Sequence, residues 1–218
     1  MNTSATQADH LTNLRDFARE AAEWIRPRAA RMDLEGYCSF LSAMYHYTRG
    51  TGEKARVAGR NCPHGEIRRF FEHMEREEEA HYLLAQSDLN ALGYDVHPDK
   101  PAAVEAFDRY WASIRPEHYR AYVGALVVFE NIARHLGPDI AELLRRLRLP
   151  RTQSRWLRAH ARADEQHGRQ ALAIAERHMH DDPRSLLQGA QRACELWKEI
   201  FRSALEDPIA VARRAEPK

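Results

Sequence analysis

Three side chains that can bind a metal ion recur on one face of a predicted helix. His160, Asp164 and His167 are separated by four and three residues, and such steps stack side chains along one face of a helix with about 3.6 residues per turn. The same steps lead to apolar residues: Trp156, Ala171 and Ile174. The three polar side chains are therefore predicted to point inward, where an unpaired carboxylate is costly. A cation held between them is the simplest explanation; the alternative is a solvated face of a helix that also carries many arginines.

Two further predicted helices carry acids on otherwise apolar stripes. In one of them, Glu78 and His81 continue a stripe that contains Phe71 and Met74. A Glu-x-x-His spacing brings both groups to one cation in carboxylate-bridged di-iron bundles. In the other helix, Glu130 is the only acid of the apolar half. It is interpreted as a metal ligand, a protonated acid or an ion-pair partner of Arg134. The remaining acids near Glu78 fall on other faces and are expected in solvent: Glu75, Glu77 and Glu79.

Together the three stripes supply three carboxylates and three histidines. This donor set is typical of two non-haem iron or manganese ions. A lone tetrahedral zinc would leave buried acids unused, and no cysteine lies on these stripes. The predicted metal ligands are Glu78, His81, Glu130, His160, Asp164 and His167.

Composition narrows the range of partners. The chain has 218 residues and no stretch typical of a linker, so one domain over 1–218 is expected, with a core at about 9–206 and a frayed C-terminal tail after Pro208. A formal net charge of +1 gives no reason to expect nucleic acid or an anionic membrane as partner. The polar N-terminus lacks the layout of a signal peptide, and the longest apolar run is too short to span a membrane. A cytoplasmic protein with three reduced thiols is expected: Cys38, Cys62 and Cys194.

Helical periodicity dominates the whole chain, and no run of alternating β-branched residues stands out. The sequence predicts an all-α bundle of about seven or eight helices, with a loose region at Gly50 and Gly52 and a helix boundary at Pro138. Residues 65–92, 116–136 and 152–178 are expected at its centre. The predicted helices cover 9–31, 33–50, 65–92, 101–114, 116–137, 138–147, 152–178 and 182–205.

The motifs resemble those of a known family. The run from Phe40 to Gly52, the segment Glu77-Glu78-Glu79-Ala80-His81 and the segment from Asp88 to Gly93 are similar to haem-oxygenase-like iron-containing redox enzymes, relatives of TenA thiaminases, PqqC and the chlamydial death-domain-associated protein. Glu-x-x-His, a lone glutamate and His-x-x-x-Asp follow one another as in haem-oxygenase-like di-iron oxidases. His167 is similar to a further histidine ligand of the chlamydial protein. The resemblance implies a single haem-oxygenase-like helical domain.

One departure from this resemblance concerns the second metal ion. Many di-iron oxidases of the group take another glutamate from an early helix, but here that region reads Met44-Tyr45-His46-Tyr47. Three outcomes stay open: His167 completes the second site, His46 substitutes for the acid, or the second site is weak. One tightly held Fe(II) and one labile Fe(II) are expected, with manganese as the alternative metal.

The resemblance implies an O2-activating non-haem di-iron oxidase or oxygenase that acts on a small amino-acid-, amine- or fatty-acid-like substrate. The sequence also allows a homodimer. Three alternative functions stay open. The first is a metal-free enzyme similar to TenA or PqqC, although the nucleophilic cysteine of TenA-like chemistry is absent here. The others are haem binding and a metal-stabilised interaction protein without turnover. The substrate pocket is expected to be mostly apolar and to be lined by Met44, His46, Phe71, Met74, Tyr122 and Trp156.

Overall fold

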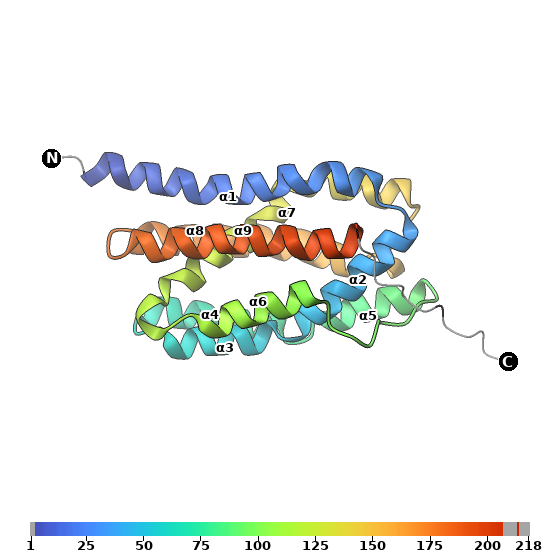
Figure 1. The fold of residues 1–218 in the computed structure, drawn as a ribbon, viewed down its shortest axis with the longest axis horizontal. Coiled ribbons are helices and arrows are strands. Elements are labelled where there is room, and N and C mark those ends of the chain that lie inside the picture. The colour runs from blue at the N-terminus through green and yellow to red at the C-terminus, as the bar shows by residue number, and fades with distance from the viewer. Residues whose placement is uncertain (1–2, 207–212, 214–218) are drawn as a thin grey trace.

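The computed structural model describes residues 3–206 and Arg213, without the side chains of residues 3–8 and of Asp164. The described part is all-α, as predicted, and contains no β-strand beyond an isolated bridge between Tyr94 and Arg213. Its nine α-helices (Figure 1) are α1 Thr3–Arg31, α2 Leu34–Arg49, α3 Thr51–Asn61, α4 Gly65–Glu78, α5 Tyr82–Ala91, α6 Ala102–Ser113, α7 Arg120–Arg146, α8 Arg155–His178 and α9 Pro183–Leu205. Two short 3-10 helices, η1 Pro116–His118 and η2 Arg151–Gln153, precede α7 and α8.

Helix α7 forms the centre of the bundle. Every residue from Ala121 to Phe129 is buried, as expected for a helix that is apolar on all sides. α7 packs along α8 and α9, and α1 covers both α7 and α9. In Figure 1, α1 runs along the upper edge while α3, α4, α5 and α6 lie along the lower edge. The segment 65–92, expected at the centre, packs mainly on α3 and α2, and α9 takes the central place beside α7.

Two glycines allow α7 and α9 to approach closely. A Cβ at Gly124 would lie 1.9 Å from the carbonyl oxygen of Leu186, and a Cβ at Gly189 would lie 2.1 Å from that of Ala121. Any side chain at either position would push the two helices apart. Glycine is therefore required at this contact for steric reasons.

Several predicted helix ends are confirmed. The Asp33 carboxylate accepts a hydrogen bond from the Gly36 amide at the start of α2, and the Asp182 carboxylate accepts one from the Ser185 amide at the start of α9. These side chains satisfy amide groups that the first helical turn leaves without a partner. Gly93 has a φ of +82° just after α5, the left-handed conformation that suits a glycine there.

Two predicted boundaries were wrong, and one helix was not predicted. Helix α2 ends at Arg49, next to its predicted end at Gly50, but Gly52 lies within an unpredicted helix, α3, whose Gly59 packs closely on Phe71 of α4. The predicted helix over 65–92 divides between Glu78 and Tyr82, where the His81 amide bonds the Glu78 carbonyl three residues back. Helix α7 passes through Pro138 because the turns on both sides of it bury apolar residues in the same core.

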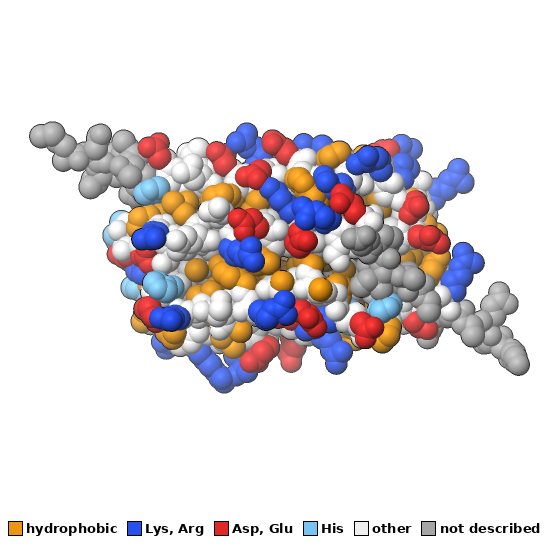
Figure 2. Space-filling model, viewed as in Figure 1, with side chains coloured by type: hydrophobic (Ala, Val, Ile, Leu, Met, Phe, Trp, Pro, Cys, Tyr) orange, Lys and Arg blue, Asp and Glu red, His pale blue; other side chains and the backbone are white. Residues whose placement is uncertain are grey.

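The cysteines and the surface agree with the sequence analysis as far as the structure describes them. Cys38, Cys62 and Cys194 are buried free thiols. Basic and acidic side chains are interspersed over the face seen in Figure 2. Within the described residues, no helix is both long and apolar enough to cross a membrane. The tail after Pro208, predicted to fray, lies outside the described residues apart from Arg213.

Candidate metal centre

Helices α4 and α8 run antiparallel and meet through polar side chains. The start of α4 faces the end of α8, where Glu66 contacts Arg177 and His178. The end of α4 faces the middle of α8, where Glu77 contacts His167. We call this contact the α4–α8 seam; its members are Glu66, Glu77 and Glu78 of α4 and His160, His167, Arg177 and His178 of α8.

Glu78, His81 and His160 come together at one end of the seam. Glu78 is the last residue of α4, His81 lies in the break before α5, and His160 is on α8. The Glu78 Oε2 atom is 2.9 Å from His81 Nδ1 and 3.9 Å from His160 Nε2. One donor atom from each residue falls within 4.8 Å of the others. This compactness is suitable for a single metal ion bound by one carboxylate and two imidazoles.

The protonation state of His160 favours a cation at this point. His160 Nδ1 lies 2.9 Å from the carbonyl oxygen of Trp156, so Nδ1 carries the hydrogen and Nε2 presents a lone pair. Nε2 is buried and has no hydrogen-bond partner within the described residues. Burial lowers the pKa of His160 to about 4, so the imidazole is neutral near pH 7. A lone pair and a carboxylate oxygen thus face each other at 3.9 Å, and a metal ion between them would satisfy both.

Glu130 and His167 form a second, adjacent pair. His167 Nδ1 lies 3.3 Å from Glu130 Oε2, and His167 Nε2 lies 2.5 Å from Glu77 Oε2. Burial raises the pKa of Glu130, and the nearby Glu78 carboxylate adds to this effect against the opposing contact with His167. Burial alone would lower the pKa of His167, but its contacts with Glu130 and Glu77 outweigh burial and raise it to about 9. Glu130 was interpreted as a possible ion-pair partner of Arg134, but the contact that the structure describes for its carboxylate is with His167.

The Glu78 and His81 side chains also affect each other's protonation. Burial tends to raise the pKa of Glu78, yet its hydrogen bond with His81 and the nearby His160 outweigh burial and lower it. The same hydrogen bond raises the pKa of His81. Glu78 is therefore ionised at neutral pH although it is almost fully buried. A buried anion of this kind needs a positive partner, either a protonated histidine or a metal ion.

Glu77 is exposed, as expected, with 43% of its side chain accessible to solvent. Its carboxylate nevertheless reaches both His167 and His73 Nε2, the latter at 3.4 Å, so Glu78 is not the only acid of this run that contacts a histidine. His73, Glu77 and His167 offer donor atoms within 4.8 Å of one another. Neither His73 nor Glu77 was predicted as a site residue, although their spacing of four residues on one helix could have indicated the pair. Asp164 lies on α8 between His160 and His167, and its side chain is outside the described residues.

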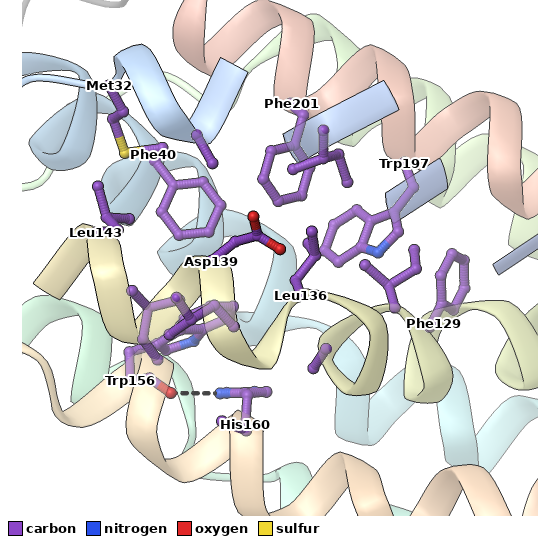
Figure 3. A pocket seen from close by; sticks show the side chains of 17 residues that line it. Met32, Phe40, Phe129, Leu136, Asp139, Leu143, Trp156, His160, Trp197 and Phe201 are labelled. Atoms are coloured by element: carbon purple, nitrogen blue, oxygen red, sulfur yellow. Dashed lines mark hydrogen bonds between the residues drawn. The ribbon is translucent and has the colours of Figure 1, made fainter. Parts of the chain in front are cut away.

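An apolar cavity of about 80 Å³ is lined in part by His160. Figure 3 shows it enclosed by aromatic and aliphatic side chains from α2, α7, α8 and α9. His160 lies at one edge, and the Asp139 carboxylate lies near the middle of these side chains. Asp139 also pairs with Arg26 at 3.1 Å. A smaller cavity of about 30 Å³ borders Glu130 and the partly buried Lys54. Phe129 lines both cavities and separates them.

Comparison with known proteins identifies the family. Residues 38–198 match the sequence profile of the family described as "Iron-containing redox enzyme". This chain belongs to that family. The iron-containing redox enzyme match spans the segments that carry Glu78, His81, Glu130, His160 and His167. No curated protein sequence matches the chain.

Comparison with solved structures confirms that this chain has a haem-oxygenase-like fold. A domain of unknown function with a heme oxygenase-like fold from Shewanella denitrificans has a TM-score of 0.71 at 19% identity, over 94% of this chain and 89% of that one. A TenA homolog from Pseudomonas syringae pv. tomato has a TM-score of 0.71 at 12% identity, over 91% of this chain and 92% of that one. At these identities the likeness extends to the fold alone.

Three of the six residues predicted to line the substrate pocket line one or the other of these two cavities. Trp156 lines the larger cavity, and Phe71 and Met74 line the smaller one.

The other three residues predicted for the pocket line neither cavity. Met44 is fully buried in the core. The Tyr122 hydroxyl bonds the carbonyl oxygen of Ile114 at 3.1 Å. His46 Nε2 lies 2.8 Å from the carbonyl oxygen of His97, outside the three histidine and carboxylate clusters of the described residues.

Proposed function

We propose that this protein is a non-haem di-iron oxidase or oxygenase that uses O2 to oxidise a small organic substrate. The family match supports iron and redox chemistry. The observation that carries the proposal is the pair of acceptors, His160 Nε2 and Glu78 Oε2, that face each other at 3.9 Å in a buried position. A metal ion accounts for this arrangement directly.

Each residue has a distinct part in the proposed centre. Glu78, His81 and His160 would hold the first ferrous ion, since their donor atoms already converge. Glu130 and His167, together with Asp164, would hold the second, and Glu77 is the acid best placed to supply charge near His167. Bound ferrous iron would supply the electrons and the open coordination position that O2 activation requires.

The surrounding protein would control the substrate and water. The larger cavity is lined almost entirely by apolar side chains and ends at His160, so it would hold the apolar part of a substrate beside the metal centre and exclude water. This lining is compatible with an amine, an amino acid or a fatty-acid-like chain that carries its reactive group at the His160 end.

Protons at the second position would be controlled by Glu77, Glu130 and His167. With its pKa of about 9, His167 holds a proton between two carboxylates at neutral pH. This proton must leave before the imidazole can bind a metal ion. One of the first ion's two histidines, His160, is already neutral, whereas His167, the second ion's histidine, must first lose its proton, so the second ion is proposed to bind more weakly than the first.

A metal-free enzyme similar to TenA remains the alternative function. Such chemistry needs a nucleophilic cysteine at the substrate. Burial raises the pKa of the Cys38 thiol to about 12 and also raises the pKa of Cys62 and Cys194. None of the three lines either cavity described above. This arrangement favours the iron-dependent function.

Anaerobic titration of ferrous ion into the metal-free protein tests the proposal. The wild type should take up one ion tightly and a second at higher concentration. Single replacements with alanine at Glu78, His81, Glu130 and His160 should each lower iron content sharply, whereas His135→Ala, a half-buried histidine outside the clusters, should not. Normal iron loading in His160→Ala would refute the assignment. O2 consumption by the ferrous protein with candidate substrates then separates an oxidase from a metal-stabilised interaction protein.

A further inference from the structure

A third group of metal-binding side chains lies at the opposite end of the α4–α8 seam. His64 directly precedes α4, His178 is the last residue of α8, and Asp181 lies in the turn before α9. One donor atom from each falls within 4.8 Å of the others. Figure 2 shows histidine side chains gathered at the end of the molecule where the α8–α9 turn lies. None of the three residues belongs to the proposed iron centre.

The orientation of His178 resembles that of a metal ligand. His178 Nε2 lies 3.3 Å from Glu66 Oε2, and Glu66 is itself paired with Arg177. When Nε2 carries the hydrogen and donates it to Glu66, Nδ1 presents a lone pair toward Asp181 Oδ2 at 3.8 Å. Histidines that bind metals commonly donate their other N–H to a carboxylate in this way. Two acceptors then face each other, as His160 and Glu78 do.

The second imidazole completes a donor set. His64 packs against the His178 ring, with 5.0 Å between ring centroids. It stands at the N-cap of α4 but makes no side-chain capping hydrogen bond, so helix capping does not account for its presence. Two imidazoles and one carboxylate are the ligands that zinc and other borderline divalent ions prefer, and a fourth position would stay open to water.

Neighbouring charges set the strength of such a site. The Asp181 Oδ2 atom is 2.6 Å from an Arg120 nitrogen, and Asp181 Oδ1 is 3.0 Å from His180 Nε2. Arg120 neutralises part of the carboxylate charge and weakens its attraction for a cation. His180 is mostly exposed and close enough to become a fourth ligand after a side-chain rotation.

We propose that His64, His178 and Asp181 form a separate site for zinc or a similar borderline divalent ion. A metal ion there ties the start of α4, the end of α8 and the start of α9 together. Because α4 and α8 also carry Glu78, His160 and His167, the ion fixes the far ends of the two helices that hold the proposed iron ligands. The inference rests on the geometry of this end of the bundle and does not require iron in the central site.

Zinc titration of the full-length protein tests the site. Both positions of the central site are removed in the double variant His160→Ala/His167→Ala, and zinc binding is followed with a competing chromophoric chelator, with cobalt absorption as the spectroscopic check. This background should bind one zinc ion. Adding His178→Ala or His64→Ala should weaken that binding at least tenfold and abolish the cobalt spectrum of a site with imidazole ligands.

A matched control is available at the same end of the molecule. His118 contacts the Ser185 hydroxyl at 3.2 Å and lies outside the cluster, so His118→Ala should leave zinc binding unchanged. Zinc should also raise the melting temperature of the iron-loaded wild type but not that of its His64→Ala variant, whose fold is checked by circular dichroism. Equal zinc affinity in the background, His64→Ala and His178→Ala proteins would overturn the proposal.

Discussion

Replacing Gly168 by alanine tests how closely α8 must approach α7 for the second metal ion to bind. A Cβ at Gly168 would lie 2.6 Å from the Glu130 carbonyl oxygen and 2.7 Å from Asn131 Oδ1. An ordinary contact begins at 3.4 Å, so the helices must separate locally by about 0.8 Å. Alanine gains about 1 kcal/mol over glycine inside a helix, whereas overpacking costs typically about 1–3 kcal/mol. The Cβ meets a backbone oxygen, which cannot rotate away, so the cost should lie in the upper part of this range, at about 2–3 kcal/mol, and we expect net destabilisation of about 1–2 kcal/mol.

The same displacement should reach the metal centre. His167 directly precedes Gly168 on α8, and its 3.3 Å contact with Glu130 is already long. Gly168→Ala should therefore weaken binding of the second ferrous ion about tenfold or more while the first ion, held by Glu78, His81 and His160, changes less than twofold.

Two measurements check this expectation. Thermal unfolding should show a melting temperature lower by about 2–8 °C, at about 2–4 °C per kcal/mol for a chain of this size. Anaerobic iron titration should show loss of the second binding step. Gly65→Ala is the matched control, because its Cβ would meet only the Arg69 side chain at 3.5 Å. A stabilised Gly168→Ala protein with two wild-type binding steps would refute the reasoning.

Three further outcomes are expected. Gly124→Ala should lower stability by about 3 kcal/mol or more in urea unfolding, because its Cβ would lie 1.9 Å from the Leu186 carbonyl oxygen; a loss below that of Gly168→Ala would contradict this. The free energy of unfolding of the metal-free protein should fall by about 3 kcal/mol between pH 6.5 and pH 4. The pKa of His160 is about 4 in the folded protein and 6.5 ordinarily, so the unfolded chain takes up the proton first as the pH falls. His160→Gln should remove this loss. His46→Ala should reduce stability but leave both iron-binding steps intact, because His46 bonds the His97 carbonyl oxygen; loss of either step would make His46 a ligand.

Much of the fold could be predicted because local signals and packing agree. Asp33 and Asp182 are side-chain caps that a single sequence reveals, and the stripes of α7 and α8 have regular helical periods. The convergence of Glu78, His81 and His160 also followed from spacing, since each lies on an apolar stripe that must face the core.

The remaining features depend on contacts between distant segments. The continuity of α7 through Pro138 depends on apolar burial on both sides, which local propensity does not encode. The contact of Glu77 with His167 joins residues ninety positions apart, and the acidic run around Glu77 looks like a solvated surface in sequence. Met44 and Tyr122 were assigned to a pocket because they are large and inward, but inward residues fill the core as often as they line a cavity.

The α4–α8 seam restricts how this sequence can change length during evolution. Glu66 and Glu77 are eleven residues apart, and so are their partners His178 and His167. Eleven residues make about three helical turns, so both pairs meet on the same faces. Deleting one residue between the two pairs in either helix would rotate one pair out of contact by about 100°. Exposed positions elsewhere on these helices tolerate point substitutions, whereas an insertion or deletion in α4 must be matched by one in α8. Descendants of this sequence should therefore keep the two spacings equal even where few other residues are shared.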